Sequence, residues 1–138
     1  MEWIISSEKE LDTIANIIAP LLGAGDVVAL NGTLGVGKTT FVRALVKCLI
    51  GKKIDVPSPT FTLLQTYDTP RFTLYHFDFY RLKSPEEAYE IGIEDAFSDG
   101  VSLIEWPDKL GKLLPKNHKT ISFEILDSGE RHICTEGF

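Results

Sequence analysis

Residues 27–40, VVALNGTLGVGKTT, join a short apolar run to a glycine-rich segment that ends in lysine and threonine. The segment satisfies the pattern G-x-x-x-x-G-K-[ST], with Gly32, Gly37, Lys38 and Thr39 at its fixed positions. Glycine lets the backbone approach phosphate oxygens closely, so that successive amide N–H groups can surround them. A helix that begins near Lys38 would add its own unpaired N–H groups and the positive end of its dipole. Between a predicted strand and a predicted helix, the pattern therefore indicates a phosphate-binding loop (P-loop) for a nucleotide.

Acidic residues end two further predicted strands. Asp78 ends the run TLYHFD, and Glu105 ends the run VSLIE. A P-loop requires an acid near its metal ion, and in a parallel sheet both carboxylates would face the crevice that the loop lines. Lys38 would neutralise the outer phosphates, and the Thr39 hydroxyl would be a ligand of Mg²⁺. The pattern leaves open which carboxylate holds Mg²⁺ and which one orients the attacking water.

Three other features have both a structural and a functional interpretation. The segment VPSPTFTL at 56–63 carries hydroxyls at Ser58 and Thr60, and it is either a switch that senses the γ-phosphate or a strand entry. His76 is two residues from Asp78 on the same strand face, where a packed core histidine is favoured over a metal ligand. Trp106 either stacks on a base or fills the core, and spacing alone does not choose between these roles.

Periodicity along the rest of the chain predicts an α/β fold in one domain, residues 1–138, with helices over a mixed sheet. SEKE at 7–10 is a capping box that begins a helix, which Pro20 should kink or end. Further helices are expected at 39–50 and at 84–97, the second with Ser84 as its cap and Pro85 in its first turn. Strands are expected at 26–31, 60–68, 71–80, 101–105, 120–126 and 131–136, with antiparallel hairpins formed by 60–68 with 71–80 and by the last two.

Composition restricts the class of protein and its partners. The chain has 138 residues, is 43% hydrophobic and 25% charged, and so has the composition of a globular domain. Its net charge of −6 argues against a broad surface for nucleic acid, so any nucleic acid would be held mainly by a partner. Cys48 and Cys134 form no C-x-x-C pair, which fits a reducing cytoplasm. We expect neither a signal peptide nor a membrane span and predict a cytoplasmic protein.

Several segments together resemble a known family. LNGTLGVGKTTFVRAL, VPSPTFTL, YHFDFYRL followed by SPEEAYEIG, and LIEWPDKL occur in the order and spacing of the bacterial TsaE (YjeE) proteins, over roughly residues 7–110. These are small P-loop ATPases of tRNA threonylcarbamoyladenosine synthesis. The resemblance implies a three-layer, P-loop NTPase-like fold, in which helices flank a mixed, mostly parallel sheet with antiparallel hairpins. It also implies weak, Mg²⁺-dependent ATP hydrolysis.

The same resemblance implies a place in a larger complex. TsaE-type proteins act with the TsaD and TsaB proteins, which transfer a threonylcarbamoyl group to N6 of adenosine 37 in tRNAs that read codons beginning with A. TsaD carries out the transfer, and the TsaE-type ATPase resets or regulates the complex. Contact with tRNA is therefore expected to be indirect.

Site residues follow from the same comparison of motifs. The resemblance assigns catalytic roles to Lys38, Asp78 and Glu105. It assigns metal binding to Thr39 and Glu105. It assigns the switch loop to Ser58, Pro59 and Thr60. ATP-binding candidates are Leu34, Gly35, Val36, Gly37, Lys38, Thr39, Thr40, Ser7, Glu8, Trp106 and Gly129. Tyr80 and Arg81 complete a D-x-Y-R element, and 129–131 are weaker candidates in a hairpin that flanks the nucleotide. The family usually has Asp at the position of Thr33 and Ala at that of Val36, which bears on the rate of hydrolysis more than on binding.

Three other functions share some of these features. A small-molecule kinase would have the same P-loop but usually an arginine-rich lid, and this chain has few arginines, none of them clustered. A GTPase is compatible with the D-x-x-G pattern at 108–111, but the chain lacks an N-K-x-D motif for guanine. A nucleotide-gated binding module without significant turnover is the third alternative.

Overall fold

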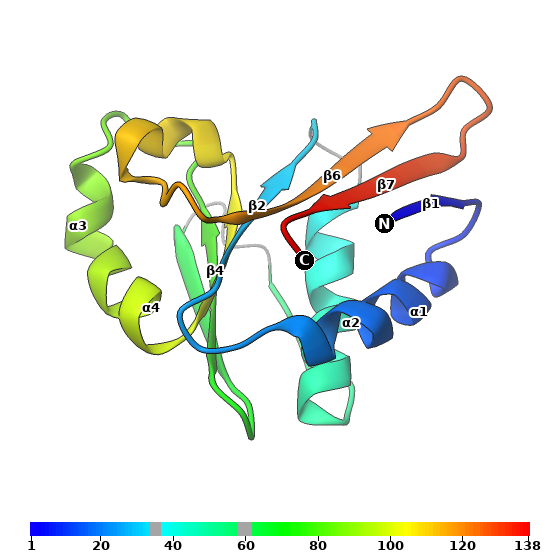
Figure 1. Cartoon of the computed structure of the whole chain (residues 1–138), viewed down its shortest axis with the longest axis horizontal. Coiled ribbons are helices and arrows are strands. Elements are labelled where there is room, and N and C mark those ends of the chain that lie inside the picture. The colour runs from blue at the N-terminus through cyan, green and yellow to red at the C-terminus, as the bar shows by residue number, and fades with distance from the viewer. Residues whose placement is uncertain (34–36, 58–61) are drawn as a thin grey trace.

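The structure, a computed structural model, describes residues 1–33, 37–57 and 62–138. A seven-stranded sheet separates two layers of helices (Figure 1). In chain order the elements are β1 Glu2–Ile5, α1 Lys9–Ile18, the 3₁₀ turn η1 Ala19–Leu21, β2 Val27–Asn31, α2 Lys38–Ile50, β3 Leu64–Asp68, β4 Thr73–Asp78, α3 Glu87–Ile91, α4 Ile93–Asp99, β5 Val101–Glu105, the 3₁₀ segment η2 Pro107–Leu113, β6 Lys119–Ile125 and β7 Arg131–Glu136. Among these helices none has the length and apolar character needed to cross a membrane.

The sheet is parallel at its centre and antiparallel at both edges. Its strand order is β1-β7-β6-β2-β5-β4-β3. The neighbours β6, β2, β5 and β4 pair in parallel, whereas β3–β4, β6–β7 and β1–β7 are antiparallel. The predicted mixed sheet and both predicted hairpins are therefore confirmed. Strand β1 was not predicted, because its four residues alternate too briefly to be distinguished from a loop.

Each face of the sheet buries a separate apolar cluster. Val28 and Leu30 of β2 pack with Leu103 of β5 beneath α1 and α2. The alternate residues Phe77 and Ile104 pack on the other side with α3 and α4. This arrangement follows from the period of two in a strand and from helices on both faces of a parallel sheet. The carboxyl ends of β2, β5 and β4 consequently meet at one edge beside the start of α2.

Two predicted helix boundaries were wrong. At the start of α1, the carboxylate of Glu10 accepts hydrogen bonds from the backbone N–H groups of Ser6 at 2.7 Å and Ser7 at 3.0 Å. Glu8 is the N-cap and the helix has no side-chain cap, so only the carboxylate half of the predicted capping box forms.

The helix expected at 84–97 is interrupted at Gly92, whose φ of 93° is left-handed and separates α3 from α4. Pro20 lies in the 3₁₀ turn after α1, as the sequence indicated.

Candidate functional site

The chain passes from β2 into α2 through two glycines in unusual backbone conformations. Gly32 follows β2 with a φ of 148°, and Gly37 is the N-cap of α2 with a φ of 106°. A side chain is strained at such angles, so glycine is required there for a physical reason. The first amides of α2 have no partners within the helix and carry the positive end of its dipole. Of the predicted binding residues, Leu34, Gly35, Val36, Ser58, Pro59 and Thr60 lie outside the described residues.

Lys38 is a buried cation at the start of α2. Its side chain is 4% exposed, and its Nζ donates a hydrogen bond of 2.7 Å to the carbonyl oxygen of Gly32. The ammonium also lies 4.5 Å from the centre of the Trp106 ring. Burial lowers the pKa of Lys38 from its ordinary value of 10.5, and the nearby carboxylates of Glu105, Asp78 and Asp108 partly oppose this effect. These three carboxylates therefore offset only part of the free-energy cost of burying the ammonium.

Glu105 and Asp78 end adjacent parallel strands in register. Asp78 of β4 pairs with Glu105 of β5, so both side chains project from the same face of the sheet. Both are buried. The Thr39 hydroxyl donates to Oε2 of Glu105 at 3.3 Å, and Oδ1 of Asp78 accepts from the backbone N–H of Tyr80 at 2.9 Å. The start of α2 and the ends of two strands thus bring a hydroxyl and two carboxylates together.

His76 adds a contact that sequence reasoning missed. Its ring is fully buried, as expected for a core histidine, but its Nε2 lies 2.7 Å from Oε2 of Glu105. His76 and Asp78 share a strand face, and Glu105 lies beside Asp78. The spacing H-x-D could have indicated the shared face. Only the register between β4 and β5 shows that this face reaches Glu105.

Trp106 forms an aromatic wall beside Lys38. Its φ of 59° and ψ of 53° are left-handed, a conformation that costs a side chain about 1 kcal/mol. Its ring centre lies 5.0 Å from that of the half-exposed Tyr80. Within the described part of the chain, its buried Nε1 has no hydrogen-bond partner. The strained turn after β5 places the indole against the ammonium, at the edge of the core.

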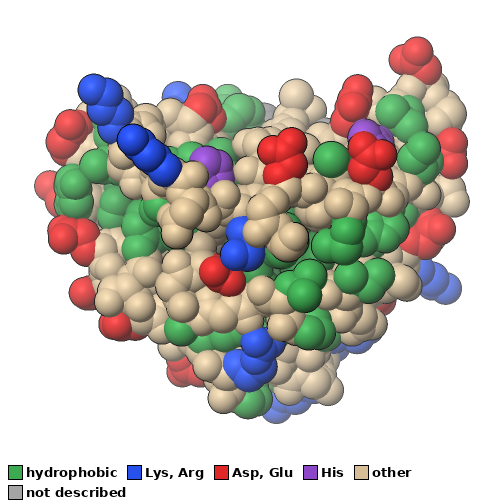
Figure 2. Space-filling view, in the orientation of Figure 1, with side chains coloured by type: hydrophobic (Ala, Val, Ile, Leu, Met, Phe, Trp, Pro, Cys, Tyr) green, Lys and Arg blue, Asp and Glu red, His purple; other side chains and the backbone are tan. Residues whose placement is uncertain are grey.

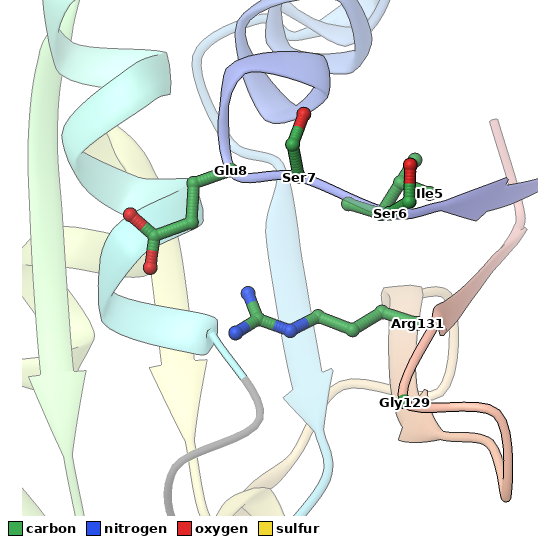
Figure 3. Close-up of a pocket in the computed structure, with 6 residues that line it drawn as sticks. All are labelled: Ile5, Ser6, Ser7, Glu8, Gly129 and Arg131. Atoms are coloured by element: carbon green, nitrogen blue, oxygen red, sulfur yellow. The ribbon is translucent and has the colours of Figure 1, made fainter.

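A pocket of about 300 Å³ adjoins the start of α2 and contains several of the weaker candidates. Figure 3 shows its lining residues, which are Ile5, Ser6, Ser7, Glu8, Gly129 and Arg131. The Arg131 side chain extends from β7 toward the first turn of α2 (Figure 3). Thr40 lines a second groove, between α1 and α2, that Glu8 also borders. The β1–α1 and β6–β7 connections therefore flank the candidate phosphate site.

The residues present fit Mg²⁺ bound together with a nucleotide. Among the described residues, no group of three or more His, Cys, Asp or Glu side chains could hold a metal ion. Mg²⁺ commonly uses only one or two carboxylates, with water and substrate phosphates as its other ligands. The Thr39 hydroxyl and the Glu105 carboxylate, 3.3 Å apart, provide a partial ligand set of this kind.

A family model described as "Threonylcarbamoyl adenosine biosynthesis protein TsaE" matches residues 5–133. The chain belongs to the TsaE family. The TsaE protein of Rickettsia bellii is 48% identical over 130 residues, which are 94% of this chain and 90% of that protein. That of Treponema pallidum is 40% identical over 134 residues, 96% of this chain and 98% of the relative. Both are named as tRNA threonylcarbamoyladenosine biosynthesis proteins.

The fold of a solved relative agrees with this membership. The crystal structure of YdiB from Bacillus subtilis superposes with a TM-score of 0.80 and 31% sequence identity, over 96% of this chain and 82% of that one. The predicted TsaE family and the P-loop NTPase-like fold are confirmed.

Proposed function

We propose that this TsaE-family chain binds and weakly hydrolyses ATP in a Mg²⁺-dependent reaction during tRNA threonylcarbamoyladenosine formation. The observation that carries the proposal is the convergence of Lys38 and Thr39, at the start of α2, with Glu105 and Asp78 at two strand ends. A cation, a hydroxyl and two carboxylates at a helix N-terminus provide the groups that phosphoryl transfer needs for charge stabilisation and positioning.

We assign each side chain a role that its contacts support. Lys38, whose ammonium bonds the Gly32 carbonyl, would turn to the outer phosphates and neutralise their charge. Thr39 and Glu105 would hold Mg²⁺, which supplies positive charge to the phosphate oxygens when it is bound. Asp78 lies beside Glu105 in register and would orient the attacking water. The amides of the first turn of α2 would donate to phosphate oxygens.

The pathway role comes from the family, and the surface is compatible with it. We propose that the chain acts in the cytoplasm with TsaD and TsaB in threonylcarbamoyl transfer to adenosine 37, and that ATP turnover resets or regulates that complex. Acidic and basic side chains are interspersed over the face shown in Figure 2, without a continuous basic stripe. The net charge of −6 supports indirect contact with tRNA through the partners.

Variants of the candidate phosphate and metal ligands test the proposal. Lys38→Ala and Thr39→Ala should abolish Mg²⁺-dependent ATP binding or turnover, measured with and without TsaD–TsaB, and should fail to restore threonylcarbamoyladenosine in bulk tRNA of a deficient strain. Lys52→Ala changes an exposed lysine just after α2 and is the matched control. Unchanged ATP affinity and hydrolysis in both site variants would refute the assignment. Binding without turnover, even with both partners, would leave a nucleotide-gated binding module.

A further inference from the structure

A surface groove runs between α1 and α2, the two helices on the opposite side of the sheet from α3 and α4 (Figure 1). This α1–α2 groove has a volume of about 260 Å³, and a second hollow of the same volume adjoins it, since Asp12, Ala44 and Lys47 line both. The charged lining of the α1–α2 groove consists of four cations and two acids: Lys9, Arg43, Lys47, Lys53, Glu8 and Asp12. Cations therefore outnumber acids here, in a chain whose net charge is −6.

Arg43 and Lys47 form a row of exposed cations along α2. They are four residues apart, so they lie on the same side of the helix, about 6 Å apart along its axis. The Nε of Arg43 donates a hydrogen bond of 3.3 Å to the carbonyl oxygen of Val56, which limits the directions that the guanidinium can take. The Nζ of Lys47 lies 3.6 Å from Oδ2 of Asp12, and both side chains are about half exposed. Such an exposed pair contributes less than about 1 kcal/mol, so Lys47 can bind another carboxylate instead.

The spacing of these two cations fits the side chains of an extended peptide. Alternate side chains of an extended segment point the same way and repeat every 6–7 Å or so, about the rise from Arg43 to Lys47. Carboxylates at alternate positions would therefore meet both cations together. The groove volume of about 260 Å³ is below the usual range of small-molecule pockets, about 300–1,000 Å³, which favours a few side chains of a surface segment over an enclosed ligand.

The distribution of charge over the two helical layers favours an acidic partner on this side. Residues 84–100, which contain α3 and α4, include six acids and no lysine or arginine. An acidic partner would be repelled there and attracted to the α1–α2 groove. A nucleic acid fits the groove less well, because Glu8 and Asp12 also line it and every nucleotide carries a phosphate charge. A peptide can place uncharged residues opposite these two acids.

We propose that the α1–α2 groove binds an acidic, extended segment of a partner protein, in which carboxylates at alternate positions pair with Arg43 and Lys47. Lys53, which follows α2 and lines the same groove, adds a third cation. This protein-binding surface is separate from the proposed nucleotide hydrolysis, because none of the three cations is among the candidate nucleotide or metal ligands. Binding of the segment therefore needs no nucleotide.

Fluorescence anisotropy with a synthetic peptide tests this surface in the intact chain without nucleotide. The probe is a fluorescein-labelled peptide of four Glu-Ala repeats, and a labelled peptide of four Lys-Ala repeats is its control. Lys47→Gln should raise the Kd of the acidic peptide about twofold to fivefold, the scale of one exposed ion pair. The double reversal Lys47→Glu with Lys53→Glu should raise it more than about tenfold. Lys116→Gln, at an exposed residue before β6, should match wild type, and added salt should weaken binding.

Five results would overturn this assignment. Three concern the peptide measurements: no binding by wild type, an equal loss in Lys116→Gln, and equally tight binding of the Lys-Ala peptide or of a labelled uridine octamer. Sedimentation that shows a wild-type dimer but a monomeric double variant would assign the groove to a second copy of the chain. A parallel loss of MgATP affinity in Lys47→Gln would make the groove part of the nucleotide site. Wild type that binds the acidic peptide but no MgATP would refute the proposed function alone and would support this surface.

Discussion

Replacement of His76 by phenylalanine removes a buried polar contact to the proposed metal ligand. The Nε2–Oε2 distance to Glu105 is 2.7 Å, and the two residues are 0% and 5% exposed. A hydrogen bond to a charged group contributes about 1.5–3 kcal/mol, and loss of one partner leaves the other buried without it. The Thr39 hydroxyl, 3.3 Å away, retains part of the contact. We therefore expect His76→Phe to lower the free energy of unfolding by about 2–3 kcal/mol.

Urea denaturation of a double-mutant cycle measures this coupling. The cycle comprises His76→Phe, Glu105→Met and the double variant, in which two apolar side chains replace the pair. The double variant should lose less stability than the sum of the single variants, with a coupling energy of about 2 kcal/mol. His132→Phe is the control, because His132 is partly exposed and its ion pairs are longer, 3.7 Å to Glu2 and 3.9 Å to Glu124. Such exposed pairs contribute under about 1 kcal/mol.

The same variant tests how the Glu105 carboxylate is oriented for metal. If His76 fixes Oε2, its loss should reduce the Mg²⁺ dependence of nucleotide binding, with an apparent Mg²⁺ affinity about tenfold weaker. An additive cycle combined with wild-type Mg²⁺ affinity would refute the reasoning, since His76 would then be only core packing. A coupling energy without any change in Mg²⁺ affinity would retain the contact but exclude its role in orienting the ligand.

Three further outcomes follow from individual contacts. The pKa of Lys38 in the folded protein lies below its ordinary value of 10.5, so between these two pH values the unfolded chain binds more protons than the folded one. The free energy of unfolding of wild type should therefore increase relative to that of Lys38→Met as the pH rises toward 10.5. A difference in urea denaturation that does not change with pH would contradict this. Gly100→Ala should lower the free energy of unfolding by about 3 kcal/mol, because the added Cβ would overlap the backbone of β4. At Gly23 an added Cβ meets open space, so Gly23→Ala should lower it by less than about 1 kcal/mol in the same denaturation assay. In Trp3→Phe the sole tryptophan is Trp106, which lies beside Lys38, so MgATP should change the fluorescence of this variant. MgATP should leave the fluorescence of Trp106→Phe unaltered. The reverse pattern would place the nucleotide elsewhere.

Elements with strong local patterns could be predicted from the sequence. The apolar run of β2 and the helical spacing of α2 depend on neighbouring residues, and both appear within one residue of their expected bounds. The acids at the ends of β4 and β5 could be identified for the same reason. Glycine was the source of an error at Gly92, where a helical pattern continues through a residue that adopts a left-handed conformation. Periodicity does not register a break in backbone conformation.

Contacts between distant segments could not be predicted, because they depend on strand order and register. β1 becomes a strand only because β7 provides a partner for its backbone groups. His76 meets Glu105 only because β4 and β5 pair in the observed register. Arg131 reaches the N-cap of α2 only because the β6–β7 hairpin folds beside β2. None of these contacts leaves a signal in a short window of sequence.

The sequence by itself determined that a strand, a glycine-rich turn and a helix would meet, because spacing and backbone conformational preference act within a few residues. It also determined which side chains could carry the chemistry. The tertiary structure alone decided which of them come together and with what burial. Side chains far apart in the chain are held within hydrogen-bond distance by the sheet, and the resulting loss of water sets the pKa of Lys38 and the strength of the His76–Glu105 contact.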